Sequence, residues 1–208
     1  MDKNIINVMN IESDDALVDV INSLINNGSL IIAIEGGSAS GKTTLAKKIQ
    51  EIYGCDECNI FHMDDFFLRP EQRTSQRLAE IGGNVDRERF QSEALEPLKN
   101  NETVCYRRFD CATQLLSDII TVEPKKITVI EGVYSMHPVF GKYYDFSLFL
   151  DISSEYQKER ILIRNSPQQA IRFFNEWIPL ENKYFSGTDI KNRVDAIFTV
   201  KSKSDENK

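Results

Sequence analysis

The chain has 208 residues, of which 41% are hydrophobic and 27% charged, and its formal net charge is −7. This length suits one domain with a proper core, and we expect residues 1–208 to form a single domain with a small lid. The negative charge argues against a nucleic-acid partner that binds a basic face. The N-terminus lacks a basic segment followed by an apolar core, and no apolar run approaches the roughly 20 residues that span a bilayer. We therefore expect a cytoplasmic protein that does not bind a membrane.

The four cysteines include a lone C-x-x-C, formed by Cys55 and Cys58. A zinc site would need a second pair of cysteines or histidines at matching spacing, and the chain has only two histidines. The pattern therefore favours plain thiols over zinc.

Apolar periodicity and turn residues predict alternating strands and helices along the chain. We expect strands at 30–35, 59–62, 126–131, 146–152 and 195–200, and helices at 13–27, 42–53, 86–99, 154–164 and 168–183. Residues 63–85 show little periodicity, residues 102–109 and 115–122 could form a β-ribbon, and residues 201–208 read as a frayed polar tail. Apolar strands alternating with helices indicate an α/β fold: a parallel sheet covered by helices on both faces.

A glycine-rich stretch between the first predicted strand and the next helix fits the pattern G-x-x-x-x-G-K-[ST] at every fixed position. Such a loop points its backbone N–H groups at phosphate oxygens, while its lysine reaches the β- and γ-phosphates and its hydroxyl ligates Mg²⁺. The stretch predicts a P-loop NTPase fold that binds ATP or GTP with Mg²⁺. The predicted nucleotide-binding residues are Gly36, Gly37, Ser38, Ala39, Ser40, Gly41, Lys42, Thr43 and Thr44.

Carboxylates follow two other predicted strands, and parallel sheets bind ligands at the carboxyl ends of their strands. We expect residues 36–43, 62–67, 131–134 and 151–153 to surround one crevice. Asp64, next to Asp65, could orient an acceptor hydroxyl and take its proton, although an aspartate there could equally cap a helix. Glu131 could hold Mg²⁺ near Thr43, the alternative being a surface side chain at a strand end.

Arginines cluster around a short segment that reads as a lid, at approximately residues 164–172. Arg160 and Arg164 share one helix face by their i,i+4 spacing, and Arg172 follows. Cations that close over a transferring phosphoryl group would stabilise its charge. Each arginine could equally lie on an exposed face, paired with Glu155 or Glu159.

The ordered set of the glycine-rich loop, Asp64-Asp65-Phe66-Phe67, Val85-Asp86, Glu131-Gly132 and the arginine-bearing helix resembles the uridine kinase and phosphoribulokinase group of P-loop kinases. The likeness covers roughly residues 30–185 and is nearest to bacterial uridine kinase-like proteins. It implies that Asp64 is the catalytic base, with Lys42, Arg160 and Arg164 stabilising the transferred phosphate. It also implies that Phe67 lies near the acceptor, that Asp86 contacts ribose hydroxyls and that Thr43 and Glu131 serve Mg²⁺.

Three departures from the family pattern concern the acceptor. Val85 replaces an aromatic residue, Gln114 stands where the base-contacting segment carries a histidine, and the lid arginines are spaced by four residues rather than three. The resemblance thus implies a kinase for the 5′-hydroxyl of a nucleoside such as uridine. Nicotinamide riboside or pantothenate is an alternative acceptor, and the sequence leaves open whether the protein forms a homo-oligomer.

A second hypothesis is a non-catalytic module that senses a nucleotide and reports to a partner. The acidic segment after the second predicted strand argues against it. So does the lack of a guanine-reading N-K-x-D motif.

Overall fold

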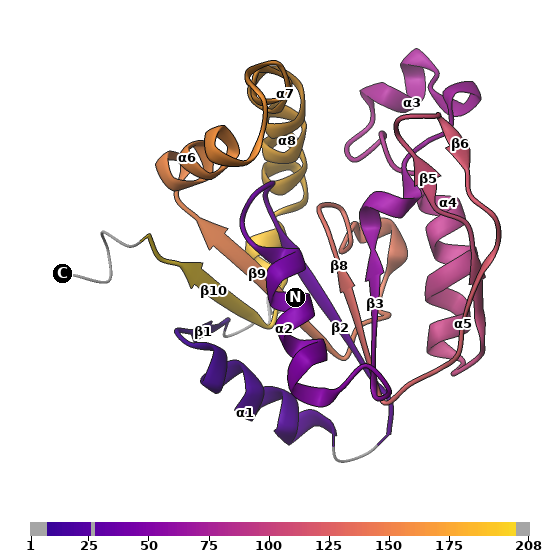
Figure 1. Cartoon of the computed structure of the whole chain (residues 1–208), viewed down its shortest axis with the longest axis vertical. Coiled ribbons are helices and arrows are strands. Elements are labelled where there is room, and N and C mark those ends of the chain that lie inside the picture. Colours follow the sequence, from indigo (N-terminus) through magenta and orange to yellow (C-terminus); the bar gives the residue numbers. More distant parts are fainter. Residues whose placement is uncertain (1–7, 26–27, 203–208) are drawn as a thin grey trace, which may run out of the picture.

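The computed structural model describes residues 8–25 and 28–202, and its centre is a parallel sheet. Within these residues the sheet has six strands in the order β1-β10-β9-β2-β8-β3 (Figure 1). Their bounds are β1 Met9–Ile11, β2 Leu30–Gly36, β3 Cys58–His62, β8 Ile127–Glu131, β9 Phe146–Ile152 and β10 Ala196–Val200. Every neighbouring pair is parallel, so the carboxyl ends of the strands meet at one edge.

Helices connect the strands, as parallel pairing requires. Their bounds are α1 Asp14–Leu24, α2 Lys42–Tyr53, α3 Ser75–Ala79, α4 Arg87–Phe90, α5 Glu96–Lys99, α6 Ser154–Arg164, α7 Pro167–Arg172 and α8 Ile178–Thr188. A π-helical turn at Gln91–Leu95 joins α4 to α5, and another at Phe173–Trp177 joins α7 to α8. Each pair is therefore one longer helix with a bulge in its middle.

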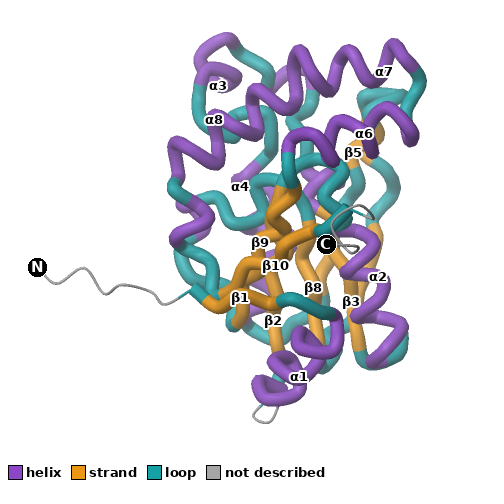
Figure 2. The backbone as a smooth tube through the Cα atoms, turned by 90° about the vertical axis from the view of Figure 1, so that its left-hand side faces the viewer, coloured by secondary structure: helices purple, strands orange, loops and turns teal. Residues whose placement is uncertain are grey.

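The two faces of the sheet are covered by different helices. One core layer packs α1 and α2 on the sheet through Leu17, Ile21, Leu45 and Ile49. On the opposite face α4, the π-helical turn after it, α5 and α8 contribute Phe90, Leu95, Leu98 and Tyr184. Figure 2 shows α2 and α4 on opposite sides of the strands. All seven residues of β2 are buried, which agrees with a continuously apolar strand covered on both faces.

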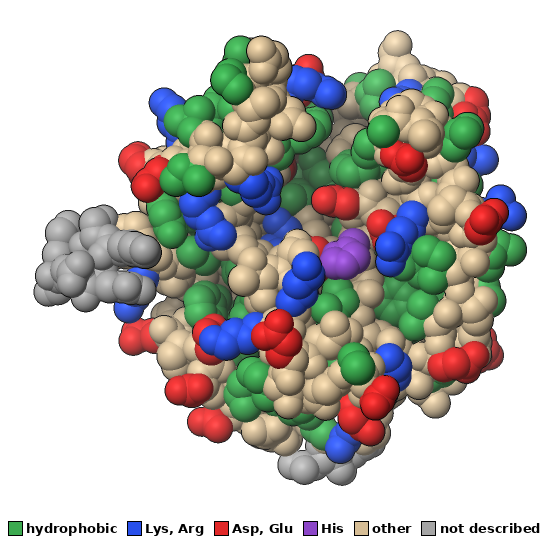
Figure 3. Space-filling view, in the orientation of Figure 1, with side chains coloured by type: hydrophobic (Ala, Val, Ile, Leu, Met, Phe, Trp, Pro, Cys, Tyr) green, Lys and Arg blue, Asp and Glu red, His purple; other side chains and the backbone are tan. Residues whose placement is uncertain are grey.

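Two groups of elements rise beyond the carboxyl edge of the sheet (Figure 1). One group comprises α6, α7 and the first turns of α8. The other comprises α3 and the short antiparallel pair of β5 Phe109–Asp110 with β6 Leu115–Leu116. A second antiparallel pair, β4 Val104–Tyr106 with β7 Ile120–Val122, lies beside the sheet, where the side-chain amide of Asn59 in β3 donates to the carbonyl oxygen of Glu123 at 2.8 Å. In the space-filling view of Figure 3 the surface is hollowed between the two groups.

These features confirm the predicted parallel sheet with helices on both faces. The β-ribbon expected within 102–122 is present as the two antiparallel pairs. Strand β1 was not predicted, and α8 continues five residues past the expected end of its helix, to Thr188. The predicted tail falls largely on residues 203–208, which lie outside the described residues, as do residues 26–27 at the end of the first predicted helix. In the described part of the chain no helix combines the length and apolarity needed to cross a membrane.

Candidate active site

The loop between β2 and α2 has the backbone of a phosphate-binding loop. Gly41 precedes α2 with φ = 107°, and Ala39 has φ = 60°. Gly36 has φ = 145°, and a Cβ there would lie 2.7 Å from the carbonyl oxygen of Leu150. Lys42, the first residue of α2, donates from Nζ to the carbonyl oxygen of Gly37 at 2.8 Å. Lys42 is thus folded back along the loop, with the helix N-terminus beside it, which is an arrangement suited to phosphate oxygens.

Thr43 and Glu131 lie together as the sequence predicts. The Thr43 hydroxyl donates to Glu131 Oε1 at 2.8 Å, across the gap between α2 and the end of β8. Hydroxyl and carboxylate oxygens are the hard donors that Mg²⁺ prefers, and Mg²⁺ usually keeps waters and phosphate oxygens as its remaining ligands. This donor set therefore fits a Mg²⁺ ion held by Thr43 and Glu131 beside a bound triphosphate.

His62, at the end of β3, is a neighbour of Glu131 that sequence reasoning did not assign. The two residues are register partners, and His62 Nδ1 lies 2.6 Å from Glu131 Oε1. Burial by itself raises the pKa of Glu131, but the contact with His62 and the charge of Lys42 bring that pKa below its ordinary value. The same hydrogen bond raises the pKa of His62. The Glu131 carboxylate is therefore held in its charged form.

Asp64 and Asp65 occupy one 3₁₀ turn, Met63–Phe66, but have different surroundings. Asp65 forms an ion pair with Arg108 at 3.1 Å and accepts from the Tyr106 hydroxyl at 3.4 Å. Asp64 has no hydrogen-bonded or ion-paired partner among the described residues, and it is open to the cleft. Desolvation by the surrounding protein raises its pKa, against the opposing charge of Lys42. The structure thus leaves Asp64, and not Asp65, free to meet a ligand.

A cleft of about 1040 Å³ brings most of the predicted site residues together. Its lining includes the phosphate loop, Asp64, Glu131 and two of the predicted acceptor contacts, Phe67 and Gln114. Its lining residues come from both groups of elements that Figure 1 shows above the carboxyl edge of the sheet, among them Arg160 and Phe173 on one side and Leu78 and Phe109 on the other.

Asp86 does not line this cleft. It is 2% exposed and caps α4, accepting from the backbone N–H of Arg89 at 3.2 Å. Its other oxygen accepts from Gln72 Nε2 at 2.9 Å and lies 3.4 Å from Arg89 Nε. The predicted contact of Asp86 with an acceptor ribose stays a prediction, and in this arrangement protein groups occupy both carboxylate oxygens.

All three predicted lid arginines line the cleft. Arg160 donates from Nη1 to the carbonyl oxygen of Ser40 at 3.3 Å, which places it against the phosphate loop. Among the described residues neither Arg160 nor Arg164 pairs with an acidic side chain, so the alternative of a pairing with Glu155 or Glu159 is not seen. Arg172 is paired with Glu176 at 3.3 Å. Two uncompensated guanidinium groups therefore face the cleft.

Two buried glutamates at the phosphate loop escaped sequence reasoning. Glu35 is fully buried at the end of β2, and Glu181 of α8 is 4% exposed. Glu35 had a usable signal, because a charged residue is unexpected in a strand covered on both faces. Glu181 had none, since a glutamate within a helix ordinarily faces solvent.

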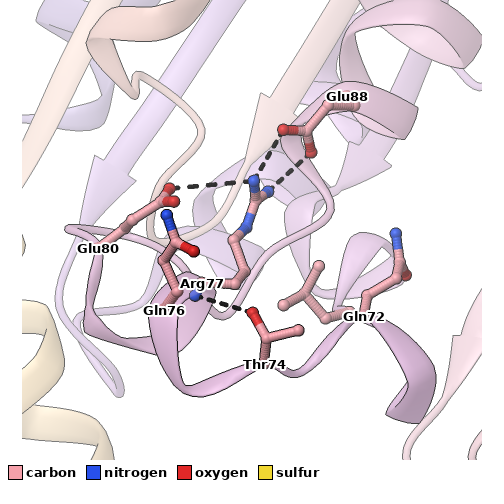
Figure 4. A pocket seen from close by; sticks show the side chains of 7 residues that line it. Gln72, Thr74, Gln76, Arg77, Glu80 and Glu88 are labelled. Carbon is pink, nitrogen blue, oxygen red and sulfur yellow. Dashed lines mark hydrogen bonds and ion pairs between the residues drawn. The ribbon is translucent and has the colours of Figure 1, made fainter.

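A second hollow, of about 420 Å³, lies over α3 and shares no lining residue with the main cleft. Figure 4 shows Arg77 in its centre, reaching both carboxylate oxygens of Glu88 at 2.7 Å and facing Glu80 at 3.9 Å. The one arginine of this hollow is therefore paired with carboxylates, whereas in the main cleft Arg160, Arg164 and Asp64 have no ion-pair partner among the described residues.

Comparison with the sequences of known proteins finds kinases among the relatives of this chain. Uridine kinase from Chlamydia pneumoniae is 25% identical over 76% of this chain and 77% of that protein. Phosphoribulokinase from a Synechocystis strain is 26% identical, over 61% of this chain and only 39% of its own length.

Solved structures share the fold. One described as a possible uridine kinase from Bacillus stearothermophilus superposes with a TM-score of 0.69, at 23% identity, over 89% of this chain and 96% of that one. D-glycerate 3-kinase from Cryptococcus neoformans gives 0.63 at 13% identity, over 80% and 86% of the two chains. The sequence pattern of one family matches residues 31–169, more than half of the chain: this protein belongs to the phosphoribulokinase / uridine kinase family.

Proposed function

We propose that this family member is an ATP- and Mg²⁺-dependent kinase that phosphorylates the 5′-hydroxyl of a nucleoside, with uridine as the first candidate. The observation that supports it most is the placement of Asp64, a carboxylate with no partner in the described part of the chain, in the cleft that holds Lys42 and the Thr43–Glu131 pair. Phosphoryl transfer needs a group that orients the acceptor hydroxyl beside a loop that holds the donor.

In this proposal each residue has a distinct task. Asp64 orients the acceptor hydroxyl and accepts its proton as the acceptor oxygen bonds to the γ-phosphorus and the bond to the β-phosphate oxygen breaks. Lys42, Arg160 and Arg164 stabilise the charge on the transferring group. Thr43 and Glu131 hold Mg²⁺, which when bound neutralises charge on the phosphate oxygens. Catalysis comes mainly from positioning and from preorganised charge.

The acceptor assignment rests on the names of the relatives and on the lining of the cleft. Several relatives at 25–27% identity are uridine kinases. Phe67 offers an aromatic surface beside Asp64, and Gln114 a polar side chain that could read a base. Because Gln114 and Val85 depart from the family pattern and Asp86 is enclosed, nicotinamide riboside and pantothenate remain in the panel of acceptors to be tested.

The test is a panel of uridine, cytidine, nicotinamide riboside and pantothenate with ATP or GTP, in which mass spectrometry detects the product. We expect one nucleoside to be phosphorylated and Asp64→Asn to lower kcat at least about 100-fold, the usual contribution of a general base. Asp118→Asn, an exposed aspartate away from the cleft, is the matched control.

Phosphorylation of none of these acceptors, or full activity of Asp64→Asn, would contradict the proposal. Slow hydrolysis without an acceptor, together with nucleotide-dependent capture of a partner, would instead favour the sensing module.

A further inference from the structure

Every polar group of Ser38, a residue of the phosphate loop, is bonded to a helix on the lid side of the cleft. Glu181 of α8 accepts from the Ser38 backbone N–H at 2.9 Å, and its other oxygen accepts from the Ser38 hydroxyl. Gln157 of α6 donates from Nε2 to the Ser38 carbonyl oxygen at 2.8 Å. The side chains of Glu181 and Gln157, from the two helices that flank α7, therefore bind all the polar groups of Ser38.

Gly37 gives independent support for this contact. The phosphate-loop pattern leaves its position free, and its φ is not in the left-handed region, so neither the motif nor the backbone calls for glycine there. A Cβ at Gly37 would lie 2.8 Å from Gln157 Nε2 and 3.5 Å from Glu181 Oε2. Glycine at this position is what lets Gln157 reach the loop.

The same part of the phosphate loop also packs against α6, α7 and the π-helical turn after α7. Ala39 contacts an apolar cluster of Ile161 from α6, Ala170 from α7 and Phe173 from the π-helical turn. Because α6 also carries Arg160 and Arg164, the polar grip on Ser38 and the apolar contact of Ala39 connect the loop to the helices that carry the free cations. Through the adjacent residues Ser38 and Ala39, the conformation of the phosphate loop therefore depends on the helices that place Arg160 and Arg164.

We propose that Gln157 and Glu181 are positioning residues that clamp Ser38 and so hold the phosphate loop in its nucleotide-binding shape. This inference rests on the nucleotide binding of the proposed function. A loop that is already in the bound shape binds more tightly, because the cost of ordering it has been met during folding. Loss of the clamp should therefore weaken nucleotide binding without removing any group that touches the triphosphate.

The test measures MgATP affinity directly by calorimetry, so it does not depend on knowing the acceptor. We expect Gln157→Ala and Glu181→Ala each to weaken binding about 3- to 10-fold, the range expected for a hydrogen bond to loop backbone. Glu181→Gln, which keeps an oxygen for the Ser38 N–H, should stay within about twofold of wild type. Lys158→Ala and Asn182→Ala, exposed neighbours in the same two helices, are the matched controls.

A double variant makes the test sharper. Gly37→Ala alone should weaken MgATP binding, because its Cβ displaces Gln157. In a Gln157→Ala background that obstacle is gone, so Gly37→Ala/Gln157→Ala should bind no more weakly than Gln157→Ala. Thermal unfolding of each variant separates loss of affinity from loss of fold.

Two results would overturn the clamp. One is an affinity within twofold of wild type for both Gln157→Ala and Glu181→Ala, and the other is a double variant whose loss is the product of the two single losses. A wild-type protein that binds neither ATP nor GTP would overturn the proposed function itself, and the clamp with it.

Discussion

Asp64 and Asp65 show how adjacent carboxylates acquire different chemistry from their neighbours. Arg108 and Tyr106 satisfy Asp65, which therefore holds the 3₁₀ turn to the β-ribbon. Asp64 points into the cleft with no such partner among the described residues, and its desolvation raises its pKa. A carboxylate with a raised pKa is a stronger proton acceptor, which suits the role of base proposed for Asp64.

This difference predicts a pH dependence of catalysis. Asp64 must be ionised to accept the proton, so kcat/KM for the acceptor should fall as the pH falls through its pKa. Because desolvation by the walls of the cleft raises that pKa above the ordinary 3.8, the acid limb should lie above pH 3.8. The measurement is a pH–rate profile at saturating MgATP, with enzyme preincubated at each pH to exclude unfolding. An acid limb that persists in the residual activity of Asp64→Asn would show that another group titrates.

At the scale of elements, α8 is attached to the sheet through the buried carboxylate of Glu35, in addition to the contact of Glu181 with the phosphate loop. Glu35 accepts from the Tyr184 hydroxyl at 3.0 Å, from the Met136 N–H at 3.2 Å and from the Gly36 N–H at 3.1 Å. One carboxylate thus joins the end of β2, the segment after β8 and α8. Burial raises the pKa of Glu35 to about 7, because these bonds only partly replace its hydration.

Glu35→Gln should therefore change how stability depends on pH. In the wild type the folded protein holds the Glu35 proton more tightly than the unfolded chain does, so this group's contribution to stability is lost as the pH rises from about 4.5 to about 7. A shift of this size corresponds to about 3 kcal/mol. The glutamine cannot titrate, so the free energy of unfolding of the variant relative to wild type should rise by up to about 3 kcal/mol between pH 5 and pH 8.

Urea unfolding of both proteins at the two pH values measures this difference. Any constant cost of the amide in the same pocket cancels, because only the change with pH is compared. A difference that does not vary with pH would show that the pKa of Glu35 in the folded protein is not raised above its value in the unfolded chain.

The elements that local sequence determines were predicted well. Ser13, the first residue of the helix predicted at 13–27, caps α1 through its side chain, and the buried strands β2, β8 and β9 follow from their largely apolar runs. Strand β1 escaped prediction because three residues carry almost no periodic signal. The two π-helical turns were also invisible, since they depend on packing rather than on local propensity.

Side chains whose role depends on tertiary contact were predicted least well. The spacing that marks Lys42 and Thr43 is local, whereas the contacts of Glu35, Gln157 and Glu181 join segments far apart in the chain. Asp86 shows the converse, because a carboxylate placed by family resemblance is enclosed here by Gln72 and Arg89. A sequence motif predicts chemistry well where one short stretch of backbone forms the site. It predicts less where the site depends on contacts between helices that are far apart in the sequence.

At the scale of the molecule, the site lies where the strand order changes direction. Strand β2 lies between β8 and β9, two strands that come much later in the sequence. After β2 the chain crosses past β8 to form β3, which leaves the phosphate loop at the carboxyl end of β2 without a covering connection to either neighbouring strand. Crevices of this kind open at such points in parallel sheets. The phosphate loop follows β2, Asp64 follows β3 and Glu131 ends β8, so all three lie at the carboxyl ends of neighbouring strands. A bound nucleotide would therefore contact the sheet and both groups of elements above it.

Nucleotide binding should therefore stabilise the whole fold, and part of this effect should require the metal. A ligand that binds only the folded state at 100 times its Kd adds about 2.7 kcal/mol, or about 5–11 °C in Tm for a chain of this size. ATP with EDTA should give a smaller shift than MgATP, because the Thr43 and Glu131 oxygens gain from the ion.

Thr43→Ala should remove the difference between MgATP and ATP with EDTA while keeping the metal-independent shift. Thr44→Ala is the matched control, since Thr44 has no hydrogen bond to Glu131 and should keep the metal-dependent increment. Differential scanning fluorimetry of the three proteins, without nucleotide and in both nucleotide conditions, makes the comparison. Equal Mg²⁺ increments in Thr43→Ala and wild type would place the ion elsewhere and leave the Thr43–Glu131 hydrogen bond a structural contact of α2 with the sheet.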